Sequence, residues 1–457
     1  MEMRDSLHRP SLTFLVALAI LTVGGIRATP AAAVSPASAS TALQSGDILD
    51  SSTWERAKDL LPPEVLKHYR EGQYANQVMD WPADKYTWPT DFLEGSKAND
   101  GRYAIGKEGH VVDATTGVQP EFIIGFPFPK IDPGDRDAGA KAVWNFLYRS
   151  WYFGTVHSES QLNFIGPKGL DRRVDVDGRF MYYDGVPVAD RPPNPHNLTS
   201  QSLAVINSPT DVQGTAALTW RYRDPNKRDS VWSYVPALRR IRQVSPANRS
   251  DGFFGSDLSQ DDGPFFDGKP EDFVWKLVGE SDQLRFVDPL NMAGESHHEW
   301  LGNGKGWRNN WPDLPTVGYM DPTWKGVAWA PTKAALAKRR FYVVEGVPKD
   351  RYYLFGKIEL FIDTIAFQGA WNRKFSWKGE LLNTYQVLAW MPQKVMRPDG
   401  TADFLQGASM AFQCAESIKM GRATVAGIKT APNATFDSRV TFDPQLFSMD
   451  TLSRFGK

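Results

Sequence analysis

Leu218-Thr219-Trp220-Arg221-Tyr222-Arg223 alternates apolar and polar side chains without a break. Successive side chains of a β-strand point to opposite faces, so a period of two predicts a strand with one buried face. Lys357-Ile358-Glu359-Leu360-Phe361-Ile362-Asp363 shows the same alternation, and only Phe361 is apolar on the polar side. We therefore expect the apolar residues of both stretches to lie on the covered face of a sheet.

Further strand candidates surround these two stretches, and Gly, Pro, Asn and Asp separate them. The candidates are Val231–Val235, Arg239–Val244, Phe341–Glu345 and Thr384–Trp390. This spacing is typical of antiparallel strands that follow one another along the chain. Strands do not alternate regularly with helices, so a parallel sheet is not expected. The sequence predicts a mainly β protein.

The first 33 residues have the three parts of a secretory signal in the right order. Arg4, His8 and Arg9 form a basic start, residues 12–26 are an apolar run interrupted only by Thr and Gly, and Ala31-Ala32-Ala33 precedes Val34. The apolar run is shorter than the ~20 residues that a membrane-spanning helix needs. We expect an exported protein whose signal peptide, residues 1–33, is cleaved near Ala33.

Residues 34–135 are expected to form a helical and extended N-terminal segment. Two short helices are predicted, one beginning at Ser52 and one from Glu64 to Glu71, because Pro62-Pro63 separates them. Gly125-Phe126-Pro127-Phe128-Pro129 cannot be a regular helix. Ala138 to Tyr148 is predicted as a helix at the start of the main body, residues 136–457.

A loop-rich insertion is predicted near residues 291–331, where Gly, Pro, Asn and Trp are concentrated. A loop of this length in a compact domain is usually functional or disordered. Its five tryptophans make disorder less favourable: Trp300, Trp307, Trp311, Trp324 and Trp329. We interpret the insertion as a folded flap that helps to cover the sheet.

The composition excludes several classes of protein. The 52 basic and 53 acidic residues give a net charge of −1, which is unfavourable for binding nucleic acid or a strongly anionic membrane surface. Cys414 is the only cysteine, so an intramolecular disulfide is impossible. With 41% hydrophobic residues and 16 Trp, the protein must be stabilised by its core.

Catalytic and metal motifs are weak in this sequence. No G-x-S-x-G motif is present, and Cys414 lies in an apolar stretch that is typical of a buried, inert thiol. His297-His298-Glu299 lacks the spacing of a metal site. We therefore predict no catalytic residue, metal or cofactor. Catalysis by residues that meet only in space stays open.

Arg239, Arg240 and Arg242 form a basic cluster shortly before four acidic residues. These acidic residues are Asp251, Asp257, Asp261 and Asp262. One hypothesis is that the two groups pair and hold a loop against the sheet. The alternative is that the arginines contact the anionic head group of a ligand.

The segments Trp232 to Arg242 and Ser250 to Asp261 resemble the signature of the LolA/LolB-like family of outer-membrane lipoprotein-sorting proteins. Gly125 to Pro133 further resembles a long subgroup of that family whose function is unknown. The resemblance implies a curved antiparallel sheet or incompletely closed barrel, with helices and loops over its concave face. It also implies a periplasmic location and action beside a lipid-exporting inner-membrane pump. This chain is roughly twice as long as the lipoprotein-sorting proteins, which puts a lipoprotein cargo in doubt.

The apolar face of the sheet and this resemblance together predict a binding or carrier protein for a lipid or another hydrophobic ligand. The residues expected to line or adjoin its apolar cavity are Leu218, Trp220, Tyr222, Ile358, Leu360 and Ile362. The alternative function is an envelope hydrolase that acts on a lipid or glycan.

Overall fold

The computed structural model describes residues 42–82, 86–294, 298–309, 317–397, 399–405, 412–427 and 435–455. Residues 42–457 form one compact unit. The expected signal peptide, His297 and Trp311 lie outside the described residues.

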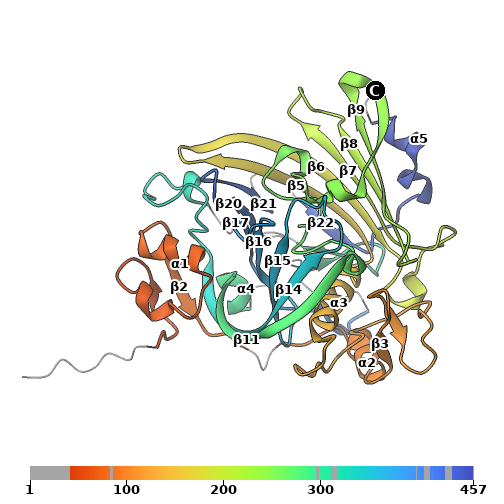
Figure 1. Cartoon of the computed structure of the whole chain (residues 1–457), viewed down its shortest axis with the longest axis horizontal. Coiled ribbons are helices and arrows are strands. Elements are labelled where there is room, and N and C mark those ends of the chain that lie inside the picture. The colour runs from red at the N-terminus through yellow and green to blue at the C-terminus, as the bar shows by residue number, and fades with distance from the viewer. Residues whose placement is uncertain are drawn as a thin grey trace, which may run out of the picture. The chain divides into compact units, whose positions relative to one another are not determined.

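One large sheet dominates the unit and contains eighteen of the strands in the described residues (Figure 1). Six consecutive strands form its first half, and each pairs antiparallel with the next. They are β5 (Thr155–Gly166), β6 (Gly169–Tyr182), β7 (Leu198–Ser208), β8 (Ala216–Tyr222), β9 (Ser230–Val235) and β10 (Arg240–Val244). The strands predicted near residues 218, 231 and 240 are therefore confirmed.

The second half of the sheet is also antiparallel, and its strands pair in the order β11, β14, β15, β16, β17, β20, β21. Their bounds are β11 (Phe273–Val287), β14 (Ala335–Pro348), β15 (Lys357–Asp363), β16 (Gly369–Phe375), β17 (Leu381–Val387), β20 (Gln413–Ser417) and β21 (Arg422–Ala426). β21 and β22 (Thr435–Ser438) both pair with β5 and join the two halves. Among the described strands, β10 pairs only with β9 and β11 only with β14, so the curved sheet is not closed into a barrel.

One pairing departs from the antiparallel pattern, because β2 (Asn76–Met79) runs parallel to β14. β1 (Ile48–Leu49) extends this edge by pairing with β2. Two small hairpins lie outside the large sheet: β3 (Tyr103–Ile105) with β4 (Val111–Asp113), and β18 (Gln393–Met396) with β19 (Ala402–Leu405).

The described part of the Trp-rich insertion is folded onto the sheet. β12 (His298–Trp300) pairs with β13 (Trp307–Asn309), and β13 pairs with β22. The side chains of Trp307 and Trp329 are almost completely buried. Tryptophan therefore anchors this segment through its large apolar surface.

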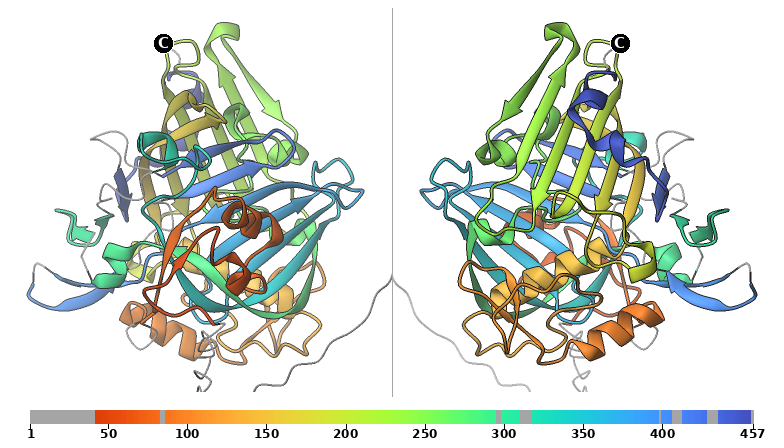
Figure 2. Two further views of the ribbon diagram at one scale, coloured as in Figure 1. Left: turned by 90° about the vertical axis from the view of Figure 1, so that its left-hand side faces the viewer. Right: turned by 90° about the vertical axis from the view of Figure 1, so that its right-hand side faces the viewer.

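Helix α3 (Ala138–Trp151) packs against β11, β14 and β15 on the inner side of the curved sheet (Figure 2). Thirteen of its fourteen residues are buried, so the helix is part of the core on all its sides. The helix predicted from Ala138 to Tyr148 is thus confirmed, and it ends one turn later than expected.

The other α-helices among the described residues are short. They are α1 (Pro63–Arg70), α2 (Thr90–Ala98), α4 (Pro289–Ala293) and α5 (Met449–Leu452). Helix α1 was predicted, whereas no helix was predicted at the position of α2. No helix in the described part of the chain combines the length and the apolar character needed to cross a membrane.

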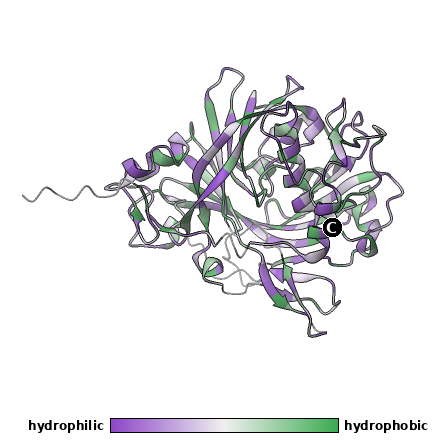
Figure 3. Ribbon diagram, turned by 90° about the horizontal axis from the view of Figure 1, so that it is seen from below, coloured by the Kyte–Doolittle hydropathy of each residue, from purple (hydrophilic) through white to green (hydrophobic). Residues whose placement is uncertain are grey.

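Two hydrophobic cores lie on opposite faces of the first half of the sheet. The larger core contains α3 and the inner face, while the smaller one contains Leu218, Tyr234, Phe447 and Leu452. The C-terminal segment with α5 therefore covers the outer face of β8. Hydrophobic and hydrophilic residues are interspersed along the strands (Figure 3), as expected for a sheet with two different environments.

Candidate functional site

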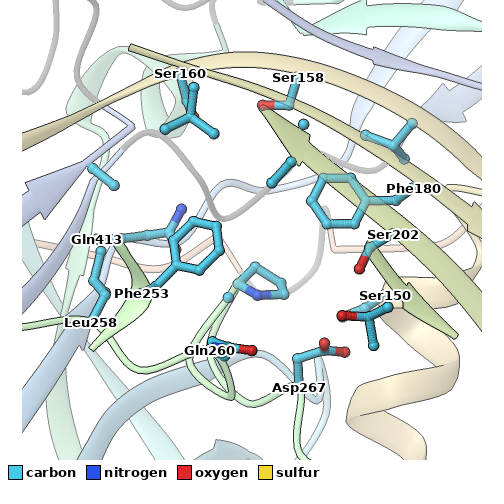
Figure 4. Close-up of a pocket in the computed structure, with 18 of the residues that line it drawn as sticks. Ser150, Ser158, Ser160, Phe180, Ser202, Phe253, Leu258, Gln260, Asp267 and Gln413 are labelled. Atoms are coloured by element: carbon cyan, nitrogen blue, oxygen red, sulfur yellow. The ribbon is translucent and has the colours of Figure 1, made fainter. Parts of the chain in front are cut away.

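A cavity lies on the inner face of β5 to β8, beside the C-terminal end of α3 (Figure 4). The centre of a water molecule can reach about 180 Å³ of this space. One bound water requires only ~10–15 Å³ by the same measure. The hollow is therefore large enough for a segment of an organic ligand.

Small side chains create this hollow. Ser158, Gly178, Ala204 and Ala217 are direct neighbours on β5, β6, β7 and β8, and all four line the cavity. A row of larger apolar residues would fill the same space, because protein interiors pack to high density. We call these four residues the small-residue row.

Gly178 has a specific steric role in this row. A Cβ atom at this position would lie 3.0 Å from Cε2 of Phe180, which is closer than ordinary contacts. Phe180 also lines the cavity and projects toward it in Figure 4. The absence of a side chain at Gly178 thus lets the Phe180 ring lie along the wall.

The rest of the wall is largely apolar with a few hydroxyl and amide groups. Strands β5 to β8 contribute Val156, Leu162, Val176, Phe180, Ser202 and Thr219. Strands β17, β20, β21 and β22 contribute Tyr385, Gln413, Ala426 and Phe436. Apolar walls with a few polar groups are typical of small-molecule sites.

A loop between β10 and β11 forms the opposite wall. Its side chains Phe253, Leu258, Gln260 and Pro264 line the cavity, and Phe253, Leu258 and Gln260 extend from this side in Figure 4. This loop, residues 249–267, is the cover of the cavity. The predicted flap near residues 291–331 contributes no described residue to the lining.

Buried ion pairs hold the cover loop against β8. Arg249 Nε donates to Asp261 Oδ1 at 2.6 Å and Arg249 Nη2 donates to Asp267 Oδ2 at 3.2 Å. Arg221 donates to Asp229 at 3.0 Å and to Asp267 at 3.2 Å. Burial raises the pKa of Asp267, and the two guanidinium groups oppose that shift. Each of the three carboxylates thus has an arginine partner, and the contact between Arg221 and Asp267 ties the loop to β8.

Two buried polar groups on the strands that line the cavity have no hydrogen-bond partner among the described residues, and Ser259 Oγ of the cover loop has none either. Ser158 Oγ and Gln413 Nε2 are both buried, while Gln413 Oε1 accepts from the Tyr385 hydroxyl. Burying a donor without a partner is unfavourable. These two groups are available to a ligand or to water.

The six residues expected to line the cavity lie elsewhere. Leu218, Trp220 and Tyr222 are on the outer face of β8, where Trp220 Nε1 donates to the Phe447 carbonyl at 3.0 Å. The other three, Ile358, Leu360 and Ile362, are at most 2% exposed in the larger core. None of the six is among the described lining residues of the cavity. The C-terminal segment covers the outer face of β8, so apolar residues are buried there without a cavity.

The predicted pairing of the basic cluster is wrong. Arg239, Arg240 and Arg242 are exposed, and the acidic residues have other partners: Asp257 pairs with Arg422, Asp261 with Arg249, Asp262 with Lys374, and Asp251 accepts from Asn248. The loop is attached by arginines outside the cluster, which charge spacing in the sequence could not distinguish. The head-group hypothesis stays a prediction.

The described residues give little support for catalysis. Cys414 is completely buried, and burial raises the pKa of its thiol, so the reactive thiolate is disfavoured. Asp267 is the only acid and no histidine is found among the described residues of the cavity wall. Two arginines already engage the Asp267 carboxylate.

Elsewhere in the described part of the chain, three side chains that can ligate a metal lie close together. Ligand atoms of His157, Glu159 and Asp177 lie within 4.8 Å of one another. His157 and Glu159 on β5 and Asp177 on β6 lie on the face of the sheet opposite to Ser158 and Gly178, away from the cavity. Asp177 already pairs with Arg179. His298, from the motif considered in the sequence, instead contacts Gln393.

The comparisons with known proteins identify the family. A family described as "Protein of unknown function (DUF1329)" matches residues 49–452. The chain belongs to this family. The match confirms the resemblance to a long family of unknown function, and no curated protein matches the chain.

Solved structures similar to this DUF1329 protein share little sequence identity with it. A DUF1329 family protein from Desulfovibrio piger has 16% identity and a TM-score of 0.44, over 70% of this chain and 99% of that chain. A LolA superfamily protein from Nitrosomonas europaea has 12% identity and a TM-score of 0.36, over 67% of this chain and 96% of that chain.

Proposed function

We propose that this DUF1329 protein is a carrier that binds the apolar part of a lipid or a similar amphiphile in the cavity of its inner face. The small-residue row is the observation that carries the proposal. Four neighbouring strands each place a small residue directly opposite the next one, so the pairing register of the strands produces the cavity.

The energetics of such a site favour an alkyl chain. Transfer of one methylene group from water to an apolar site contributes about 0.8 kcal/mol, so even a short buried segment gives useful affinity. Ser158 Oγ and Gln413 Nε2 supply hydrogen-bond donors for an oxygen atom of the ligand. Release would then need only a movement of the cover loop.

The location and partner belong to the same proposal. The signal-like residues 1–33 support export, and the family resemblance stated for Trp232 to Arg242 supports the periplasm and a lipid-exporting inner-membrane pump as the partner. A carrier between membranes would need a covered apolar site of this kind.

Native mass spectrometry of the protein purified from its own cell envelope tests the proposal. We expect a bound species that organic extraction identifies as an amphiphile with an alkyl chain. An Ala204→Phe variant, which fills the middle of the small-residue row, should carry less of it. Protein that is free of ligand, together with no binding of added fatty acid, would refute the carrier function.

A further inference from the structure

The small-residue row continues beyond the cavity to the free edge of the sheet. Ala217 on β8 is the neighbour of Ser233 on β9, and Ser233 is the neighbour of Arg242 on β10. Two residues further along β9 on the same face, Val235 is paired with Arg240. A row of neighbouring residues therefore leads across the sheet from Ala217 past Ser233 to Arg242.

The pairing register places Arg240 and Arg242 on the inner face. Ile241, which lies between them, packs against the smaller core on the outer face, so its two neighbours on β10 point to the other side. Arg239 is different, because it lies in the turn before the strand with a left-handed φ of 48°. Only two of the three clustered arginines thus share a face with the cavity.

These two arginines are suited to bind an anion. Both are exposed, and the described part of the chain supplies no carboxylate within ion-pair distance of either. Two cations on the same side of one strand repel each other, and a bound anion relieves that repulsion. Guanidinium groups bind carboxylates and phosphates through paired hydrogen bonds.

The distance along this row of neighbours matches the length of an alkyl chain. Three strand spacings of about 4.8 Å separate Ala204 from Arg242, which gives about 14 Å. One leaflet of a bilayer holds its acyl chains in about 15 Å, half of the ~30 Å hydrocarbon core. A head group at Arg242 would therefore allow a tail to reach the cavity.

We propose that Arg240 and Arg242 bind the carboxylate or phosphate head group of an anionic amphiphile whose tail occupies the cavity. This inference rests on the proposed carrier function and specifies its ligand class. The cover loop encloses the tail, and the head group remains at the open edge formed by β10. Arg239 has no part in this site.

Fluorescence titration with a dansyl-labelled undecanoic acid and with its methyl ester tests the assignment. The site variant is Arg240→Gln with Arg242→Gln, in the mature full-length protein. The control is Arg239→Gln with Lys276→Gln, which removes the same charge at two exposed positions outside the site. We expect the site variant to bind the acid about tenfold more weakly, with the ester unaffected and the control close to wild type.

Other outcomes would overturn the assignment. Equal losses for acid and ester, or equal losses in the site variant and the control, would show that the two arginines do not bind the head group. Displacement of the acid by inorganic phosphate at a similar concentration would indicate a site for free anions rather than for an amphiphile. If wild-type protein binds neither acid nor ester, the carrier function itself fails and this inference fails with it. If the site variant binds the acid and the ester as tightly as the wild-type protein does, the head-group site is refuted and the carrier function is not.

Discussion

Ala217 and Leu218 are adjacent on β8 but point to opposite faces, so one substitution at each position tests where the ligand binds. Ala217 lines the cavity, and its side chain is only partly buried. Ala217→Leu adds three carbon groups to the hollow. If these groups displace three methylene groups of the ligand, the binding free energy becomes less favourable by about 2.4 kcal/mol, at ~0.8 kcal/mol for each group. This change corresponds to about fiftyfold weaker affinity.

The stability of the same variant separates a cavity from a packed core. Filling a hollow should change the free energy of unfolding by less than about 1 kcal/mol, whereas overpacking a filled core costs about 1–3 kcal/mol. Leu218→Ala is the matched control, because Leu218 is completely buried in the smaller core. It should destabilise the fold by about 2–5 kcal/mol and leave the affinity of the folded protein unchanged.

Two measurements on each variant decide the outcome. Titration with a fluorescent fatty acid gives the affinity, and urea denaturation gives the free energy of unfolding. An Ala217→Leu variant that is clearly destabilised and yet binds ligand as tightly as wild type would refute the cavity assignment. Weaker binding in folded Leu218→Ala would place the ligand on the outer face instead.

Three further predictions concern the loop, the pH dependence and the N-terminus. Arg249→Ala removes the ion-pair partner of the buried Asp261 and should cost about 3–5 kcal/mol of unfolding free energy in denaturant. Arg422→Ala, at a more exposed pair, should cost under about 1 kcal/mol, and similar losses for the two variants would contradict a buried network. Burial raises the pKa of Glu271 from 4.5 to about 7, so its charged form is disfavoured in the fold and stability should fall as the pH rises through that window. Glu271→Gln should flatten this fall in denaturation series at several pH values, and an unchanged slope would exclude Glu271 as its source. Edman sequencing of exported protein should begin near Val34, and a chain that retains residues 1–33 would disprove cleavage.

The strands could be predicted from the sequence because their signal is local. Alternation at Leu218–Tyr222 and Ile358–Ile362 depends only on which residues are neighbours in the chain, and β8 and β15 form where it occurs. Helix α3 was predicted for the same reason. Helix α2 was missed, because the surrounding Pro, Gly and Trp outweighed the short helical pattern between Thr90 and Ala98.

The cover loop illustrates what charge spacing alone cannot decide. Arg249 and Arg221 bind the loop carboxylates, and they are separated from each other by β9 and β10 in the sequence. The arginines that stand closer together, Arg239, Arg240 and Arg242, are exposed. A buried pair forms where the fold removes both partners from water, and that depends on tertiary packing rather than on distance along the chain.

Alternation shows which residues share a face, but it does not show which face is hollow. On β8 the more apolar set, Leu218, Trp220 and Tyr222, packs against the C-terminal segment, while Ala217 and Thr219 face the cavity. A Leu side chain at Gly178 or Ala204 would fill part of this cavity. The feature that predicts a cavity is therefore small residues that come into register on adjacent strands. Such a row becomes visible only when the pairing of the strands is known, because its members are separated by whole strands in the sequence.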